Sequence, residues 1–115
     1  MLPFRQRLTP QQRRDECVRV VSRRPDHVPV IFERKSRDVP LIDREKYLVP
    51  PTLTGAQLQF VLRRRLALDP KHALFLHCHE RLVSAHALVL DLYAQHKDAE
   101  DGFLYVTYAT ESAFG

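Results

Sequence analysis

The sequence contains little of several residue types that mark particular classes of protein. Its 115 residues include no tryptophan, one methionine, two cysteines and three glycines. The glycines, Gly55, Gly102 and Gly115, lie far apart, so the chain has no glycine-rich loop of the kind that binds phosphate. The chain is nevertheless long enough to bury one hydrophobic core without help from disulfides or a structural metal.

Long hydrophobic runs are also missing. No apolar stretch approaches the roughly 20 residues that a membrane-spanning helix needs. The opening residues Met1 to Arg5 lead into charge, so we expect no secretory signal and a soluble, cytosolic protein. Cys17 and Cys78 each lie in an apolar segment, and we interpret them as buried free thiols. A single bridge is the alternative in a secreted chain.

The net charge of +4 is unevenly distributed. The first 24 residues carry seven basic side chains against only Asp15 and Glu16: Arg5, Arg7, Arg13, Arg14, Arg19, Arg23 and Arg24. One interpretation is a solvated helix face, and the other is a surface for nucleic acid, anionic lipid or an acidic protein. Aromatic residues are not interleaved with these arginines as stacking on bases requires, so no nucleic-acid partner is expected.

Helices and strands can be placed from capping residues and residue type. Thr9 and Thr54 each precede a glutamine by three residues, which predicts helices over about 10–23 and 55–68, and a third helix is predicted within 88–96. Strands are predicted at 28–33, 46–49, 73–78 and 103–108. This order predicts an α+β roll with a four-stranded mixed sheet, the ubiquitin β-grasp, preceded by a helical extension over 1–24. The ubiquitin-like unit then spans 25–115.

A set of short stretches carries a resemblance that extends from about Pro10 to Gly115 with almost no change in length. They are 25–31 (PDHVPVI), 46–50 (KYLVP), 53–54 (LT), 63–66 (RRRL), 73–75 (ALF), 103–106 (FLYV), 111–112 (ES) and 114–115 (FG). Together they resemble the autophagy ubiquitin-like modifiers, the GABARAP and light-chain-three family, also called autophagy-related protein 8.

The resemblance implies a modifier, not an enzyme, with no cofactor. A cysteine protease exposes the terminal glycine, here Gly115, and activating and conjugating enzymes join it to phosphatidylethanolamine. The protein would be cytoplasmic, and on the autophagosomal membrane when lipidated. Glycine suits this role because it has no Cβ to block a narrow enzyme cleft. Nothing follows Gly115, so either the natural product ends there or the chain represents a processed form. A family member that binds cargo without being lipidated is the nearer alternative.

The resemblance also implies binding of cargo receptors through short aromatic-x-x-aliphatic motifs that add to strand 46–49. The aromatic pocket would be lined by Glu16, Val20, Pro29, Lys46, Leu48 and Phe103. The aliphatic pocket would be lined by Tyr47, Val49, Pro50, Leu53, Leu58 and Val61. Arg44 and Lys46 would meet acidic residues of the motif. The alternative interpretation is that five of these residues are ordinary core residues: Val20, Leu48, Leu53, Leu58 and Phe103.

Three further features depart from the pattern or suggest other chemistry. Arg24 stands where the family often has an aromatic residue. His27 stands where arginine is frequent, and we expect it to weaken acidic-motif binding above about pH 6.5. The triplet 77–79 (HCH) suggests a metal site. On a strand, however, its two histidines point to one face and the cysteine to the other, so the three cannot converge on one ion. We therefore expect no metal there, with both histidines facing solvent beside a buried thiol.

Overall fold

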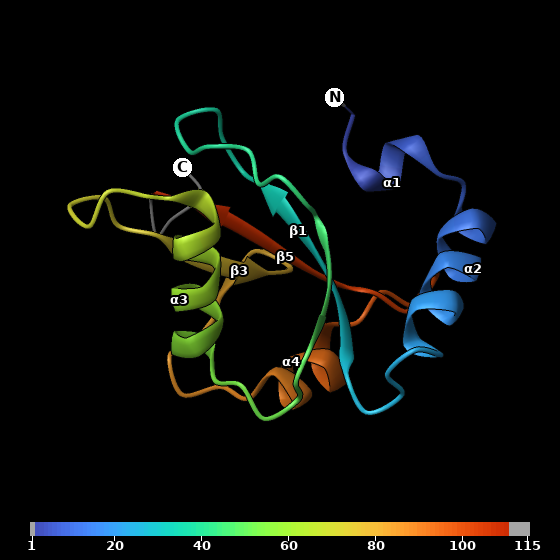
Figure 1. The fold of residues 1–115 in the computed structure, drawn as a ribbon. Helices are drawn as coiled ribbons and strands as arrows, with labels where there is room; N and C mark the ends of the chain where they lie inside the picture. The colour runs from blue at the N-terminus through green and yellow to red at the C-terminus, as the bar shows by residue number, and fades with distance from the viewer. Residues whose placement is uncertain (1, 111–115) are drawn as a thin grey trace.

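The structure, a computed structural model, describes residues 2–110 as a sheet with helices on both faces (Figure 1). The described helices are α1 (Phe4–Arg7), α2 (Pro10–Val21), α3 (Gly55–Leu66) and α4 (Val89–His96). The described strands are β1 (Val28–Arg34), β2 (Lys46–Val49), β3 (Phe75–Cys78), β4 (Arg81–Leu82) and β5 (Leu104–Ala109). Within these residues, no helix is long and apolar enough to cross a membrane.

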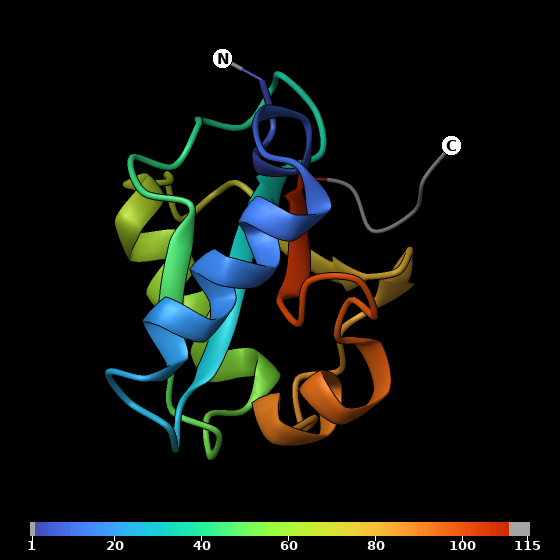
Figure 2. The same cartoon turned by 90° about the vertical axis from the view of Figure 1, so that its right-hand side faces the viewer.

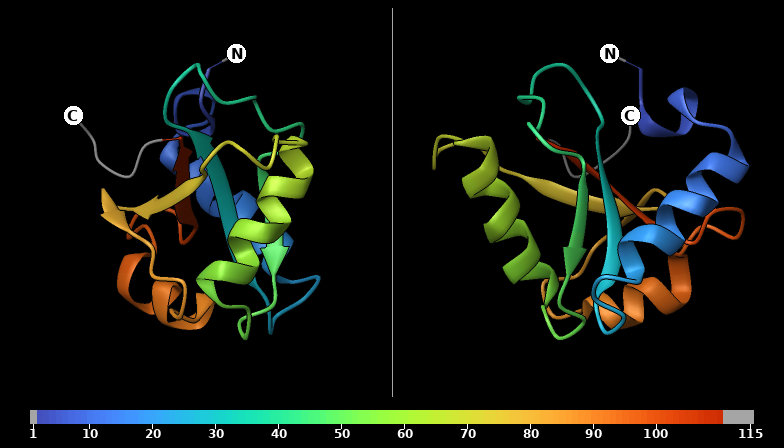
Figure 3. Two further views of the ribbon diagram at one scale, coloured as in Figure 1. Left: turned by 90° about the vertical axis from the view of Figure 1, so that its left-hand side faces the viewer. Right: turned by 45° about the vertical axis from the view of Figure 1, so that its right-hand side comes forward.

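The sheet has the strand order β2-β1-β5-β3-β4. The central strands β1 and β5 are parallel, and the other neighbours are antiparallel, which gives a mixed sheet. Among the described strands β2 is therefore an edge strand, with β1 as its only neighbour. In Figure 3 (right), the sheet separates α3 on one face from α2 on the other. Figure 2 shows α2 lying across the central strands.

Both predicted capping boxes are confirmed. The Thr9 side chain accepts a hydrogen bond from the Gln12 amide, and the Gln12 side chain accepts one from the Thr9 amide, at 3.2 and 2.9 Å. Thr54 and Gln57 make the same reciprocal pair. These bonds satisfy amides that a helix start otherwise leaves without partners. Helix α2 ends at Val21 and helix α3 at Leu66, each two residues earlier than predicted.

The four predicted strands are confirmed with small shifts, but the sheet has a fifth strand, so the four-stranded prediction is incomplete. Strand β4 contains only Arg81–Leu82 and pairs with β3 across a tight turn. Two residues are too few to show the alternation by which a strand is recognised in sequence. The four-residue helix α1 was missed for a similar reason, because one turn shows no helical period.

The two faces of the sheet bury separate cores because successive residues of a strand point to opposite faces. On β1, Val30 and Phe32 belong to the larger core with α3 and α4, while Ile31 belongs to the smaller core with α2. The smaller core consists of Phe4, Cys17, Val20, Ile31, Phe103 and Tyr105. The N-terminal helices thus cover one face of the central strands.

A buried ion pair fixes α2 to the sheet. Arg13 is only 5% exposed and Asp101 only 2%, and their nearest N and O atoms lie 2.9 Å apart. Asp101 also accepts hydrogen bonds from the Tyr105 hydroxyl and, at 2.8 Å, from the Phe103 amide. The interpretation of the N-terminal arginines as a solvated face is therefore wrong for Arg13. A buried arginine keeps its charge when a carboxylate pairs with it.

The two cysteines are buried free thiols, as predicted. Burial raises the pKa of Cys17 to about 11 and that of Cys78 to about 12, so both stay protonated at neutral pH. The histidines beside Cys78 differ from the prediction. His79 is exposed, but His77, on a strand that lies between β4 and β5, is only 1% exposed.

We predict that Arg13→Met destabilises the fold by about 3 kcal/mol, because it leaves the Asp101 carboxylate buried without its cation. The matched change Arg14→Met, at the neighbouring exposed arginine of α2, should cost under about 1 kcal/mol. Urea unfolding measures both. Equal effects of the two substitutions would show that the ion pair contributes nothing to stability.

Candidate functional site

Strand β2 presents an unpaired edge whose outward groups can be assigned. Its register with β1 sets Phe32 opposite Glu45, and the Phe32 amide donates to the Glu45 carbonyl at 2.8 Å. Hydrogen-bonded and non-hydrogen-bonded pairs alternate along an antiparallel ladder. Tyr47 and Val49 therefore bond to β1, while the main-chain groups of Lys46 and Leu48 point outward. Pro29, opposite Leu48, occupies a position where its missing N–H is not needed.

Side chains alternate across the same strand and flank its edge with two different surfaces. Lys46 and Leu48 point toward α2, where Leu48 packs against the smaller core. Tyr47 and Val49 point toward α3 and belong to or pack against the larger core. The two predicted pocket groups are thus separated onto opposite faces of the sheet, one beside each helix.

The surface on the α2 side combines an apolar floor with a charged rim. Val20, Pro29 and Phe103 are buried, and Glu16, Lys46 and Leu48 are half-buried. Glu16 pairs with Lys46 and, at 3.0 Å, with the guanidinium of Arg19. These hydrogen bonds, from Arg19 first and then Lys46, lower the pKa of Glu16 to about 2. Its pairing is complete above its ordinary pKa and is lost as the pH falls toward 2.

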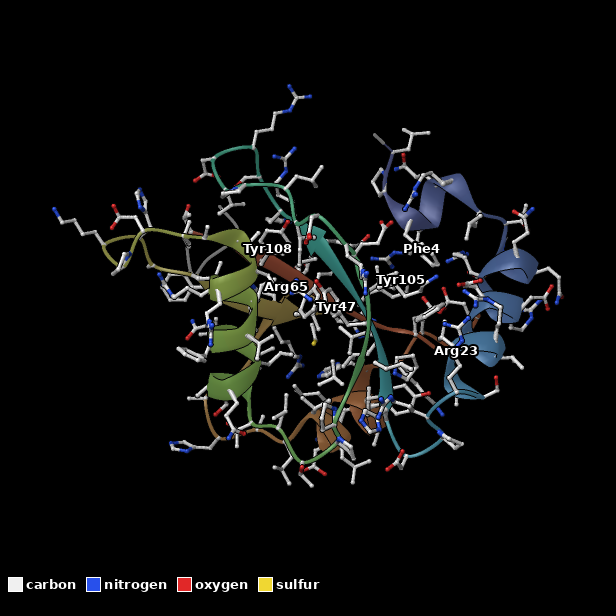
Figure 4. The ribbon with its side chains drawn as sticks, in the orientation of Figure 1. Phe4, Arg23, Tyr47, Arg65, Tyr105 and Tyr108 are labelled. Carbon is white, nitrogen blue, oxygen red and sulfur yellow. The ribbon has the colours of Figure 1, made fainter. Side chains whose placement is uncertain are left out.

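The surface on the α3 side is more open. Tyr47 and Leu53 are half-buried, Pro50 is exposed and Val61 is 44% exposed. Tyr47 stacks edge-on against Phe32, and the guanidinium of Arg65 lies 5.7 Å from its ring centre (Figure 4). The Tyr47 hydroxyl is buried and is one of the few such atoms in the described residues with no hydrogen-bond partner.

Two of the predicted lining residues lie deeper than the others. Leu58 is 1% exposed and Phe103 is fully buried, so both form the floor of their surface and pack within a core. A ligand would reach either side chain only after its neighbours shift. Burial therefore supports the alternative interpretation as core residues for Leu58 and Phe103. Val20 is also buried in the smaller core, whereas Leu48 and Leu53 are half-buried.

A groove of about 1020 Å³ opens beside the start of β2. Arg44 and Lys46 both line it, as the predicted acid-binding pair requires, together with Glu16. Its other wall comes from α1, including Phe4, and from Leu8 just after it, and an ion pair between Arg7 and Glu45 joins that wall to the residue before β2. Sequence reasoning missed this wall because α1 itself was not predicted.

His27 lies immediately before β1 and is already engaged by an acid of the chain. Its Nδ1 atom is 2.9 Å from Oδ1 of Asp26. This hydrogen bond is the main reason why the pKa of Asp26 is lowered. An acidic motif that used His27 would therefore compete with Asp26. Gly115, the predicted conjugation site, lies outside the described residues.

Comparison with known proteins now decides the family. A family model described as "Autophagy protein Atg8 ubiquitin like" matches residues 12–115. The chain belongs to the Atg8 family. It is accordingly a ubiquitin-like protein of autophagy, and the predicted ubiquitin-like fold is confirmed.

Relatives of known name support the Atg8 assignment over nearly the whole chain. The chain is 45% identical to autophagy-related protein 8 of Mycosarcoma maydis, covering 91% of this chain and 89% of that protein. It is 44% identical to autophagy-related protein 8d of Arabidopsis thaliana, covering 91% and 88%. The crystal structure of Trypanosoma brucei ATG8 superposes with a TM-score of 0.89 at 36% identity, covering 100% and 99%.

Proposed function

We propose that this Atg8-family chain is conjugated through Gly115 to phosphatidylethanolamine on autophagosomal membranes and recruits cargo receptors there. The observation that carries the recruitment half is the β2 edge, with outward main-chain groups at Lys46 and Leu48 and a different surface on either side. An extended peptide that adds to this edge places alternate side chains toward α2 and toward α3. An aromatic residue and an aliphatic residue separated by two others match that geometry.

The polar groups around the edge favour an acidic peptide. Arg44 and Lys46 line one groove at the start of β2, so acids near the aromatic residue would meet two cations. Glu16 already pairs with Lys46, and a motif acid would have to compete with it. Selectivity for acidic motifs then depends on how readily this pair exchanges partners.

The magnitudes of the contributing interactions keep the affinity of a bare motif weak. Two buried anchors contribute about 1.5–3 kcal/mol each, and a few strand hydrogen bonds add roughly 1 kcal/mol each. Association costs about 4–15 kcal/mol, so even at the low end of that cost these terms leave a net of only about −5 kcal/mol for a bare motif, or a Kd of roughly 0.2 mM. A receptor that binds several chains displayed on one membrane gains further apparent affinity.

Conjugation would supply the membrane anchor. No described helix can cross a bilayer, and a lipid attached to the last residue provides that apolar anchor. In this proposal the chain is not an enzyme: the cysteine nucleophiles belong to the activating and conjugating enzymes and to the processing protease. The two thiols of this chain are buried and protonated, which suits a passive role for them.

For the peptide site, we predict that Leu48→Ala weakens binding of an acidic aromatic-x-x-aliphatic peptide at least roughly tenfold, because it removes the half-buried apolar side chain at the strand edge. The matched control is Leu82→Ala on β4, an exposed leucine on the other edge strand, which should leave affinity unchanged. Fluorescence anisotropy measures binding, and circular dichroism checks folding. A folded Leu48→Ala protein with unchanged affinity would refute the peptide site.

For conjugation, we predict a phosphatidylethanolamine adduct when the chain is incubated with activating and conjugating enzymes, ATP and liposomes. Mass spectrometry should find the adduct in the intact chain and not in a chain that lacks Gly115. Enzymes shown to be active on another substrate provide the control. If the intact chain gives no adduct with those enzymes, the lipidation half of the proposal is refuted. The peptide site is tested independently by the binding experiment.

A further inference from the structure

Two histidines from distant parts of the chain meet away from the β2 edge. His79 lies in the turn between β3 and β4, and His96 is the last residue of α4. Their Nδ1 atoms are 3.3 Å apart, their ring centres are 5.3 Å apart, and their planes are inclined by 75°. The nitrogens are thus closer than the rings, so the two Nδ1 atoms converge on each other.

This spacing is what two ligands of one metal ion require. Histidine nitrogens lie about 2.0–2.1 Å from zinc, so two of them on a tetrahedral ion are about 3.3–3.4 Å apart. Rings that radiate from such an ion have their centres roughly 5 Å apart. Both separations agree with the observed pair, and a bound ion would replace a single hydrogen bond between the rings without moving either backbone.

The turn that presents His79 does not use the residues that suit its conformation. His79 and Glu80 have φ angles of 48° and 65°, and they connect the paired residues Cys78 and Arg81. A two-residue hairpin turn with both φ angles positive favours Asn-Gly or Asp-Gly. Histidine is tolerated there, but glutamate is not preferred. An unfavourable turn that points an imidazole at a second imidazole is a reason to look for a ligand.

The pair is accessible and suited to binding. His79 is exposed and His96 is half-buried. In the hydrogen bond between the rings one Nδ1 carries a proton, so both rings must take the Nε2–H tautomer before both Nδ1 lone pairs can bind one ion. The charge of Arg81 opposes a cation and limits the affinity.

We propose that His79 and His96 together bind one divalent transition-metal ion that links the β3–β4 turn to the end of α4. Imidazole pairs select Zn²⁺, Ni²⁺ and Cu²⁺ over Mg²⁺ and Ca²⁺, which prefer oxygen ligands. The described residues contain no group of three or more metal-binding side chains, so water completes the coordination. This site is independent of both lipid conjugation and peptide binding.

The test is calorimetric titration of the tag-free full chain with NiCl₂ and ZnCl₂ near neutral pH. We expect one ion per chain, and His79→Asn and His96→Gln should each weaken binding at least roughly tenfold, because each loses one of two protein ligands. The matched control His72→Asn removes an exposed histidine elsewhere and should bind like the unsubstituted chain. In NMR spectra, Ni²⁺ should broaden the His79 and His96 ring signals first.

His79→Asn also separates loss of a ligand from loss of the fold. Asparagine suits a positive φ at least as well as histidine, so the metal-free Tm of this variant should not fall. Saturable binding that survives His79→Asn would overturn the proposal, as would the absence of saturable binding in the unsubstituted chain. Loss of binding in His72→Asn as well would place the metal elsewhere and would also overturn it.

Discussion

The arrangement around β2 depends on the buried contact between Arg13 and Asp101. Asp101 is held by the Tyr105 hydroxyl and the Phe103 amide, so its carboxylate has a fixed position beneath α2. The Arg13 guanidinium can stay buried only in contact with that carboxylate, which sets where α2 crosses the sheet. Glu16 and Val20 follow on the same helix, so the anchoring of Arg13 positions them beside β2 together with the packing of Cys17 and Val20 in the smaller core.

The open edge of β2 is the second constraint: it must avoid unspecific strand pairing and still accept a peptide. An exposed edge strand invites pairing with any extended chain, and short strands and lysines are the usual protection. Strand β2 has four residues and begins with Lys46. The same features favour one kind of ligand, because a short edge strand pairs with a short peptide and a lysine favours an acidic peptide. Side chains of this strand pack against the cores on both faces of the sheet, Tyr47 against the larger and Leu48 against the smaller.

Local signals in the sequence were sufficient for much of the fold. The capping boxes at Thr9 and Thr54 and the apolar strand 103–108 predicted their elements, because hydrogen bonds and alternation act over a few residues. The buried state of Arg13 could not be predicted in this way, since its partner Asp101 lies 88 residues away. The burial of His77 and the pairing of His79 with His96 likewise depend on which strands and helices become neighbours. For the site, the resemblance supplied the residue groups, and the structure separated them onto two faces.

The proposed peptide site requires that a partner peptide adds to the β2 edge through main-chain groups of Lys46 and Leu48. Residue-resolved amide hydrogen exchange, with and without a saturating acidic aromatic-x-x-aliphatic peptide, tests it most directly. In the free chain we expect Lys46 and Leu48 amides to exchange quickly and Tyr47 and Val49 amides to exchange slowly, because only the latter bond to β1. The peptide should slow exchange at Lys46 and Leu48. Bound peptide that leaves these two amides unprotected would contradict the claim.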